Sequence, residues 1–159
     1  MKKTIAERSI FLVVSCVALA AALFLNSMRV PVLRLPEEVE AMVGQEASTA
    51  FTAFFTDFQE WYNSCEITEE GVQLTKENDY QTLGNILMSM NAYWEACAQL
   101  DGENMEQIQA FNQPILVVFM LALNMVMTLE TTDSYVIAAE EWKAIGGYVR
   151  DVITVYQAQ

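Results

Sequence analysis

Apolar residues recur at steps of three and four along most of the chain from about residue 37 onward, which is the pattern of a helix with one buried face. Pro36-Glu37-Glu38 is a favourable start, since proline suits the first turn and acids suit the positive end of the helix dipole. The pattern predicts helices over 37–65 and 79–100, separated by a polar stretch. The expected inward positions are Val39, Val43, Ala47, Ala50, Phe51, Phe54, Phe58, Trp61, Tyr62 and Cys65 in the first helix, and Leu83, Leu87, Met90, Trp94, Cys97 and Ala98 in the second.

Two further helices are predicted in the second half of the chain, over 105–131 and 134–157. Pro114 interrupts or kinks the first of them, because proline lacks the N–H that a helix interior needs. The last helix carries a heptad-like seam with alternating steps of four and three, which is typical of a helix that packs along a partner helix. This seam is the candidate interaction face, and its residues are Tyr135, Ala139, Trp142, Gly146, Val149, Ile153 and Tyr156.

No alternating pattern of useful length predicts a β-strand. The sequence therefore predicts an all-α fold in which residues 37–159 form an acidic four-helix bundle. The apolar run 115–129 leaves an alternative open, namely a second membrane span. Its length of about 22 Å as helix, its Asn124 and its lack of flanking Lys or Arg favour a core helix. The amphipathic helices around it also need an apolar element to pack on.

A different pattern occupies the N-terminus, where the run 10–25 is continuously apolar and basic residues stand on both sides. With the adjoining Ser9 and 26–28 the run approaches the length that spans a hydrocarbon core of about 30 Å. We predict that residues 1–28 form a signal anchor with a transmembrane helix. Pro31 and Pro36 disfavour helix in 29–36, which we interpret as an extended stalk.

Two alternatives remain for the N-terminal segment. A cleavable signal peptide would end near Ala20, after the small-residue site Ala18-Leu19-Ala20, and would give a secreted protein. A lipoprotein signal would use Cys16, but the apolar stretch before that cysteine is short and the stretch after it is hydrophobic. The retained anchor is preferred because long apolar runs are usually retained.

The net charge of −13 conceals two regions of opposite sign. Residues 1–34 contain five basic residues and one acid, a net charge of +4, whereas 35–159 contain three basic residues and twenty acids, a net charge of −17. Because nucleic acids are bound through Lys and Arg, a body this acidic is not expected to bind nucleic acid. The chain also has no histidine, the commonest general base and metal ligand, and we therefore expect a protein that is not an enzyme.

Cys65 and Cys97 both lie near predicted helix ends, and in an oxidising compartment they are disulfide candidates. If the first two helices formed an antiparallel hairpin, the cysteines would lie about 27 Å apart, which forbids a bond. The connection 66–78 is longer than a hairpin needs and would allow a crossover that brings them together. The sequence narrowly favours the bridge, and two buried free thiols are the alternative.

No group of side chains predicts a cofactor or a metal site. The carboxylates are interpreted as solvated helix ends, and the group at 101–106 lacks the spacing of a calcium loop. Tryptophans 61, 94 and 142 are expected as core aromatics. The methionines of the body are expected to fill the core, and they are Met88, Met90, Met105, Met120, Met125 and Met127.

These observations predict a single-pass protein of the bacterial cytoplasmic membrane, held by residues 10–28, with its C-terminal body in the periplasm. The expected function is that of a helical interaction module, an accessory or assembly subunit of an envelope complex that binds protein partners, including basic surfaces. One alternative is a ligand-sensing helical domain, which would need a second span. Another is an exclusion, immunity or lysis-regulating protein of a mobile element.

Overall fold

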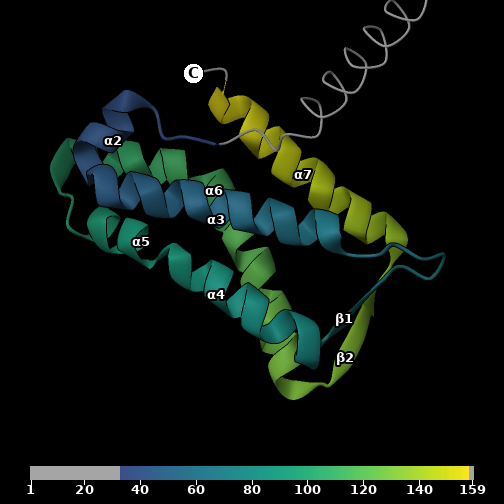
Figure 1. Cartoon of the computed structure of the whole chain (residues 1–159). Coiled ribbons are helices and arrows are strands. Elements are labelled where there is room, and N and C mark those ends of the chain that lie inside the picture. The colour runs from purple at the N-terminus through teal and green to yellow at the C-terminus, as the bar shows by residue number, and fades with distance from the viewer. Residues whose placement is uncertain (1–32, 158–159) are drawn as a thin grey trace, which may run out of the picture. The chain divides into compact units, whose positions relative to one another are not determined.

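Helices dominate the computed structural model, which describes residues 33–157 (Figure 1). The predicted signal anchor at 1–28 and the first part of the predicted stalk lie outside the described residues. Residues 33–36 are not helical, as predicted, but they are not a free stalk, because Leu33 and Leu35 are buried in the core.

The first predicted helix is present in two pieces, α2 (Glu37–Val43) and α3 (Gln45–Ser64). Gly44 separates them with φ 88° and ψ 165°, a backbone conformation that is essentially restricted to glycine. α3 carries most of the predicted inward face. Its buried apolar side chains are Ala47, Phe51, Phe54, Phe55, Phe58 and Trp61.

The second predicted helix is also divided. A π-helical turn, η1 (Lys76–Tyr80), leads into α4 (Gln81–Ser89), and a turn at Met90 leads into α5 (Asn91–Ala98). The Thr75 hydroxyl caps η1 by accepting a hydrogen bond from the backbone N–H of Asn78. α3 packs against both α4 and α5, which run back along it below α3 in Figure 1.

α6 (Gly102–Thr131) continues through Pro114 as one helix of 30 residues, so the proline does not interrupt it. A proline in a helix leaves a backbone carbonyl of the preceding turn without its usual donor. Two α7 hydroxyls donate in this region, Tyr156 to the carbonyl of Phe111 and Tyr148 to the carbonyl of Pro114. These contacts tie α6 to α7 (Ala139–Gln157) around the proline.

The structure corrects the prediction of an all-α body, because it contains a small antiparallel sheet. β1 (Val72–Thr75) pairs with β2 (Ser134–Ile137), with Val72 opposite Ile137 and Thr75 opposite Ser134. The predicted helix 134–157 therefore begins later, at Ala139. The chain is mostly helical, as predicted, but the first two predicted helices are each divided and a two-stranded ribbon is added (Figure 1).

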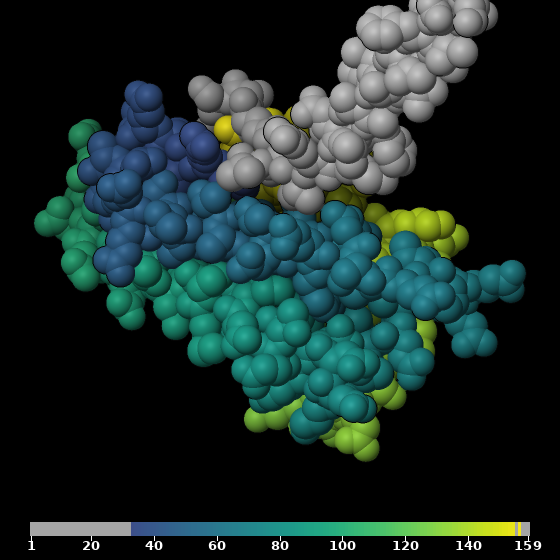
Figure 2. Space-filling model, viewed as in Figure 1, coloured from purple at the N-terminus to yellow at the C-terminus, as the bar shows by residue number. Residues whose placement is uncertain are grey.

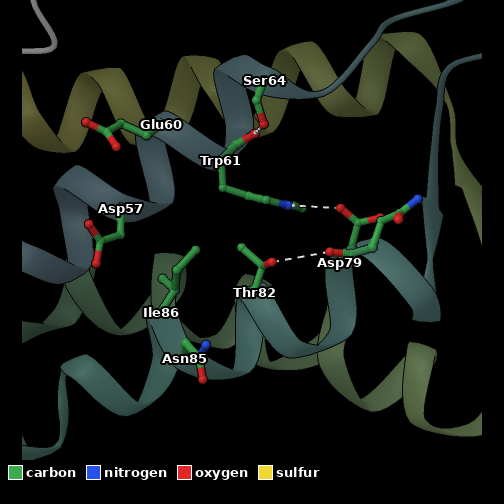
Figure 3. Close-up of a pocket in the computed structure, with 9 residues that line it drawn as sticks. Asp57, Glu60, Trp61, Ser64, Asp79, Thr82, Asn85 and Ile86 are labelled. Atoms are coloured by element: carbon green, nitrogen blue, oxygen red, sulfur yellow. Dashed lines mark hydrogen bonds between the residues drawn. The ribbon is translucent and has the colours of Figure 1, made fainter.

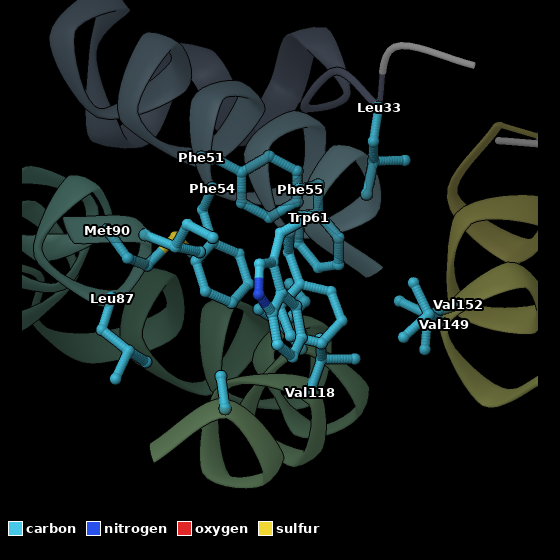
Figure 4. Packing of buried hydrophobic residues seen from close by; sticks show 14 of the residues in the cluster. Leu33, Phe51, Phe54, Phe55, Trp61, Leu87, Met90, Val118, Val149 and Val152 are labelled. Carbon is cyan, nitrogen blue, oxygen red and sulfur yellow. The ribbon is translucent and has the colours of Figure 1, made fainter. Parts of the chain in front are cut away.

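Aromatic side chains fill the centre of the core (Figure 4). The Phe54 ring meets Phe55 edge-on at 5.1 Å between centroids and lies 6.0 Å from Phe119 of α6. Burial of each such ring contributes about 1.5–3 kcal/mol. In the space-filling view, α3 and the α4–α5 pair lie side by side on the face toward the viewer (Figure 2).

The tryptophan prediction is confirmed at two of three positions. Trp142 is completely buried and Trp61 is 7% exposed, whereas Trp94 is half-buried. The Trp142 ring stacks on Tyr62 at 4.5 Å between centroids and meets Trp61 edge-on at 5.6 Å. This cluster joins α3 to α7, two helices far apart in the sequence.

Candidate binding surface

Four of the seven exposed large apolar side chains among residues 33–157 lie together on one side of α6. Leu116, Val117, Met120 and Met127 are each about half exposed, at 48, 45, 51 and 57%. Asn124 is exposed among them and is the polar member of the group. We call these five residues the α6 outer face. Leu116, Val117, Met120 and Asn124, together with Leu121, also line a hollow of about 480 Å³.

The opposite side of α6 is a core element, as predicted for the run 115–129. Ile115, Val118, Ala122 and Leu129 are completely buried. These contacts fix the rotation of the helix, so that the α6 outer face points away from the core. Since the free surface of α6 is normally where a globular protein places charge, the outer face is a departure from the usual amphipathic pattern.

Three exposed methionines, two of them on α6, correct a sequence prediction. Met90 and Met125 are buried as expected, but Met120 and Met127 lie on the α6 outer face, and Met88 of α4 is 58% exposed. Periodicity failed for Met120 and Met127 because residues 107–129 contain no charged residue and, from 115 onward, both sides of the helix are apolar. That uncharged run of 23 residues is the one signal in the sequence that reveals more apolar surface than a single buried face needs.

Charged residues stand at both ends of α6. Exposed Asp101, Glu103 and Glu106 stand at its N-terminal end, and Glu130 and Asp133 at its C-terminal end. Glu106 precedes Met120 by fourteen residues, which at about 100° per residue places the two within roughly 40° of each other on the helix. The C-terminal end is partly compensated, because the Lys76 ammonium donates to the carbonyl of Glu130 at 2.9 Å.

α6 is also the helix, among the described residues, that is long and apolar enough to cross a membrane. Its most apolar window has a mean hydropathy of 1.8, and 28% of that window is buried inside the body. Core helices of soluble proteins meet the same criterion. The completely buried residues on the inner side of α6 agree with the predicted core role. The remaining residues of the window leave apolar side chains of α6 exposed.

A second hollow, of about 650 Å³, lies between α3 and the start of α4 (Figure 3). Asp57 and Glu60 lie at its rim, and Trp61 and Asp79 line it. Asp79 holds local structure, since it accepts hydrogen bonds from the Trp61 indole N–H at 3.0 Å and from the backbone N–H of Thr75 at 2.8 Å. The Asp79 carboxylate therefore joins α3 to the start of η1.

The heptad-like seam packs inward. Trp142, Val149, Ile153 and Tyr156 are buried, and Gly146 lies directly beneath the Tyr62 ring. The two N-terminal members, Tyr135 of β2 and Ala139, are half-buried. The seam thus joins α7 to the helices of its own body.

Cys65 and Cys97 are free thiols, so the narrowly favoured disulfide is absent. Cys65 directly follows α3 and lies near Asp79, whereas Cys97 is in the last turn of α5 and contacts the Asn112 amide. α3 and the α4–α5 pair run antiparallel to each other (Figure 1), which puts Cys65 and Cys97 at opposite ends of this helical hairpin. The long connection that suggested a crossover instead supplies β1.

Burial raises the pKa of the Cys65 thiol to about 12, with a further contribution from the Asp79 carboxylate, and burial also raises the pKa of Cys97. The thiolate is the reactive form, so at pH 8 we expect Cys65 to react with iodoacetamide about a thousandfold more slowly than an ordinary thiol. Mass spectrometry of alkylated peptides measures this. In urea both thiols should react at the ordinary rate; fast labelling of the folded protein would contradict the burial of Cys65.

Among residues 33–157 no three His, Cys, Asp or Glu side chains converge as a metal site would require. Comparison with known proteins adds no assignment: no family model, no curated protein and no solved structure matches this chain.

Proposed function

We propose that this protein is a membrane-anchored helical interaction module, an accessory or assembly subunit of an envelope complex. The basic-flanked apolar run 10–25 supports a signal anchor in a bacterial cytoplasmic membrane, with the body, a four-helix arrangement extended by a β-ribbon, on the periplasmic side. A binding role suits a chain without histidine, whose described cysteines have raised pKa values.

The observation that carries this proposal is the α6 outer face. Residues 33–157 contain four basic residues and twenty acids, a net charge of −16, yet this face has no charged member. Scattered exposed apolar residues are ordinary, but a group on one helix face is typical of a protein interface. The occupant we propose is an apolar segment of another protein of the same membrane.

Purification of the complex from native membranes in mild detergent tests the proposal. We expect a stoichiometric partner with the wild-type chain, and its loss when Leu116→Ser and Met120→Ser are combined. Ile67→Ser with Val136→Ser is the matched control, since these residues are 49 and 53% exposed but lie elsewhere. A wild-type protein that purifies alone as a monomer would overturn the proposal, as would equal loss with the control pair.

A reporter fused after Gln159 tests the orientation. Because the body is proposed to lie outside the cytoplasm with α6 in its core, we expect a periplasmic reporter such as alkaline phosphatase to be active and a cytoplasmic one to be inactive. Cytoplasmic activity would indicate that α6 crosses the membrane, which would favour the two-span, ligand-sensing alternative.

A further inference from the structure

We propose that the α6 outer face binds a single apolar α-helix of a different protein, whose Lys- or Arg-bearing end lies beside Glu106, at the acidic N-terminal end of α6. This inference rests on the proposed function and specifies the chemistry of the partner. It is carried by the shape of the face, by the acids that bracket it and by the net charge of the body.

The dimensions of the face suit one helix. Leu116 and Met127 are eleven residues apart, or about 16 Å along α6 at 1.5 Å per residue. Leu116, Met120 and Asn124 form one row at i, i+4 and i+8, and such rows are the ridges that pack into the grooves of a second helix. The two methionines adapt their shape to a neighbour more readily than branched side chains do.

The charges around the face indicate that one end of the partner helix carries basic residues. Asp101, Glu103 and Glu106 form an acidic end, whereas at the other end the Lys76 ammonium reaches the Glu130 carbonyl and offsets part of the negative charge. An apolar helix with basic residues at one end would place its apolar part on the face and its charge beside the acids. Such complementarity contributes chiefly to selection and to the association rate.

A second copy of this chain fits poorly for the same reason. Two bodies of −16 repel each other. In a parallel pairing of α6 helices the acids at 101–106 would meet their own counterparts, and in an antiparallel pairing they would meet Glu130 and Asp133. Like charges opposite one another are destabilising in either arrangement. The partner is therefore a different protein.

An anionic lipid surface fits no better. Glu106 lies on the same side of α6 as Met120, so a membrane that covered the face would bring this carboxylate to negatively charged headgroups. Asn124 also favours a protein helix over lipid. Its exposed amide sits among apolar side chains and requires a hydrogen-bonding group opposite it when covered. A protein helix supplies such a group at a fixed position.

The test uses the full chain in nanodiscs of zwitterionic lipid and two fluorescent synthetic peptides. Both carry the same apolar helical sequence of about 20 residues with one central Asn, and they differ only in a terminal cluster of three Lys or three Glu. Fluorescence anisotropy measures binding, with empty nanodiscs as the baseline. We expect the Lys peptide to bind about tenfold more tightly than the Glu peptide at low ionic strength, and the difference to shrink in high salt.

Two charge variants locate the selective contact. Glu103→Gln with Glu106→Gln should remove most of the preference for the Lys peptide. Glu69→Gln with Glu70→Gln removes the same charge from an exposed loop and should leave the preference intact. Leu116→Ser with Met120→Ser should weaken binding of both peptides about tenfold, since it removes the shared apolar contact.

Three results would overturn the inference: equal affinity for the two peptides, an unchanged preference in the Glu103/Glu106 variant, or a homodimer that Leu116→Ser with Met120→Ser dissolves. Flotation of the full chain with anionic vesicles that depends on the α6 outer face would assign the face to lipid and would overturn it too. If the native partner is lost with the serine variant while the peptides bind equally, the proposed function stands and the basic end inferred for the partner helix is wrong.

Discussion

Replacing Trp142 with alanine is expected to lower the free energy of unfolding by about 3–5 kcal/mol, the usual cost of deleting a large core aromatic. The side chain is completely buried, stacks on Tyr62 and meets Trp61 edge-on. Its removal would leave a cavity at the junction of α3 and α7, which few neighbouring side chains could fill. Denaturation of the full chain in mild detergent, followed by circular dichroism, measures the loss.

Trp142→Phe is the matched control. It keeps an aromatic ring in the stack and removes an indole N–H that has no hydrogen-bond partner among the described residues. We therefore expect a cost well below that of alanine, about 1–2 kcal/mol. Met127→Ala, at an exposed site, should change stability by no more than about 0.5 kcal/mol. A Trp142→Ala variant as stable as Met127→Ala would show that α7 is not packed on α3.

Two adjacent glycines of α7 are expected to respond to alanine in opposite directions. A Cβ on Gly146 would collide with the hydroxyl oxygen of Tyr62 and stand 2.6 Å from its ring carbon Cζ, so Gly146→Ala should destabilise by about 1–3 kcal/mol. A Cβ on Gly147 would meet nothing within 4 Å. Gly147→Ala should therefore stabilise by up to about 1 kcal/mol, the helix propensity difference between the two residues.

Tyr62 is the reason why a larger residue at Gly146 is costly. Its ring is held by stacking on Trp142, and its hydroxyl donates to the Trp142 carbonyl at 2.6 Å, so it cannot swing aside. In a double-mutant cycle, Tyr62→Leu should absorb most of the cost of Gly146→Ala, whereas it should leave the effect of Gly147→Ala unchanged. Denaturation midpoints of the four combinations decide this, and equal effects at the two glycines would refute the close contact.

Helices were predictable from this sequence because their apolar period is sustained for many turns. The two strands were not, because each has four residues and their pairing joins positions more than sixty residues apart in places. Ser134–Ile137 was assigned to the last helix because Tyr135 stands at the correct step for the seam. In fact the chain turns into helix only after Ile137, whose carbonyl lies so close to Gly71 that a side chain there would collide with it.

The path of the chain between the first two long helices was ambiguous for a physical reason. A connection such as 66–78 is long enough to cross the bundle, and equally long enough to leave it and pair elsewhere. Only the pairing of β1 with β2 distinguishes these paths, and it depends on a segment far along the sequence. The disulfide prediction at Cys65 and Cys97 failed at this point.

The α6 outer face could not be predicted from the sequence, because from residue 115 onward the residues on both sides of this helix are apolar. Periodicity identifies a buried face by contrast with a polar one, and residues 115–129 offer little such contrast. The sequence therefore predicted the inner side of α6 and its core role, but it could not show which apolar residues remain outside. That distinction required the positions of α3, α4 and α7 around the helix.

The β-ribbon also sets the order in which the body can be completed during synthesis. β1 pairs with a strand that emerges some sixty residues later, and Trp61 near the end of α3 is covered by Trp142 of α7. A chain made from its N-terminus therefore holds an unfinished core until α7 has left the ribosome. For a protein proposed to be exported, late closure keeps the body unfolded, and so able to be threaded across a membrane, through most of translation.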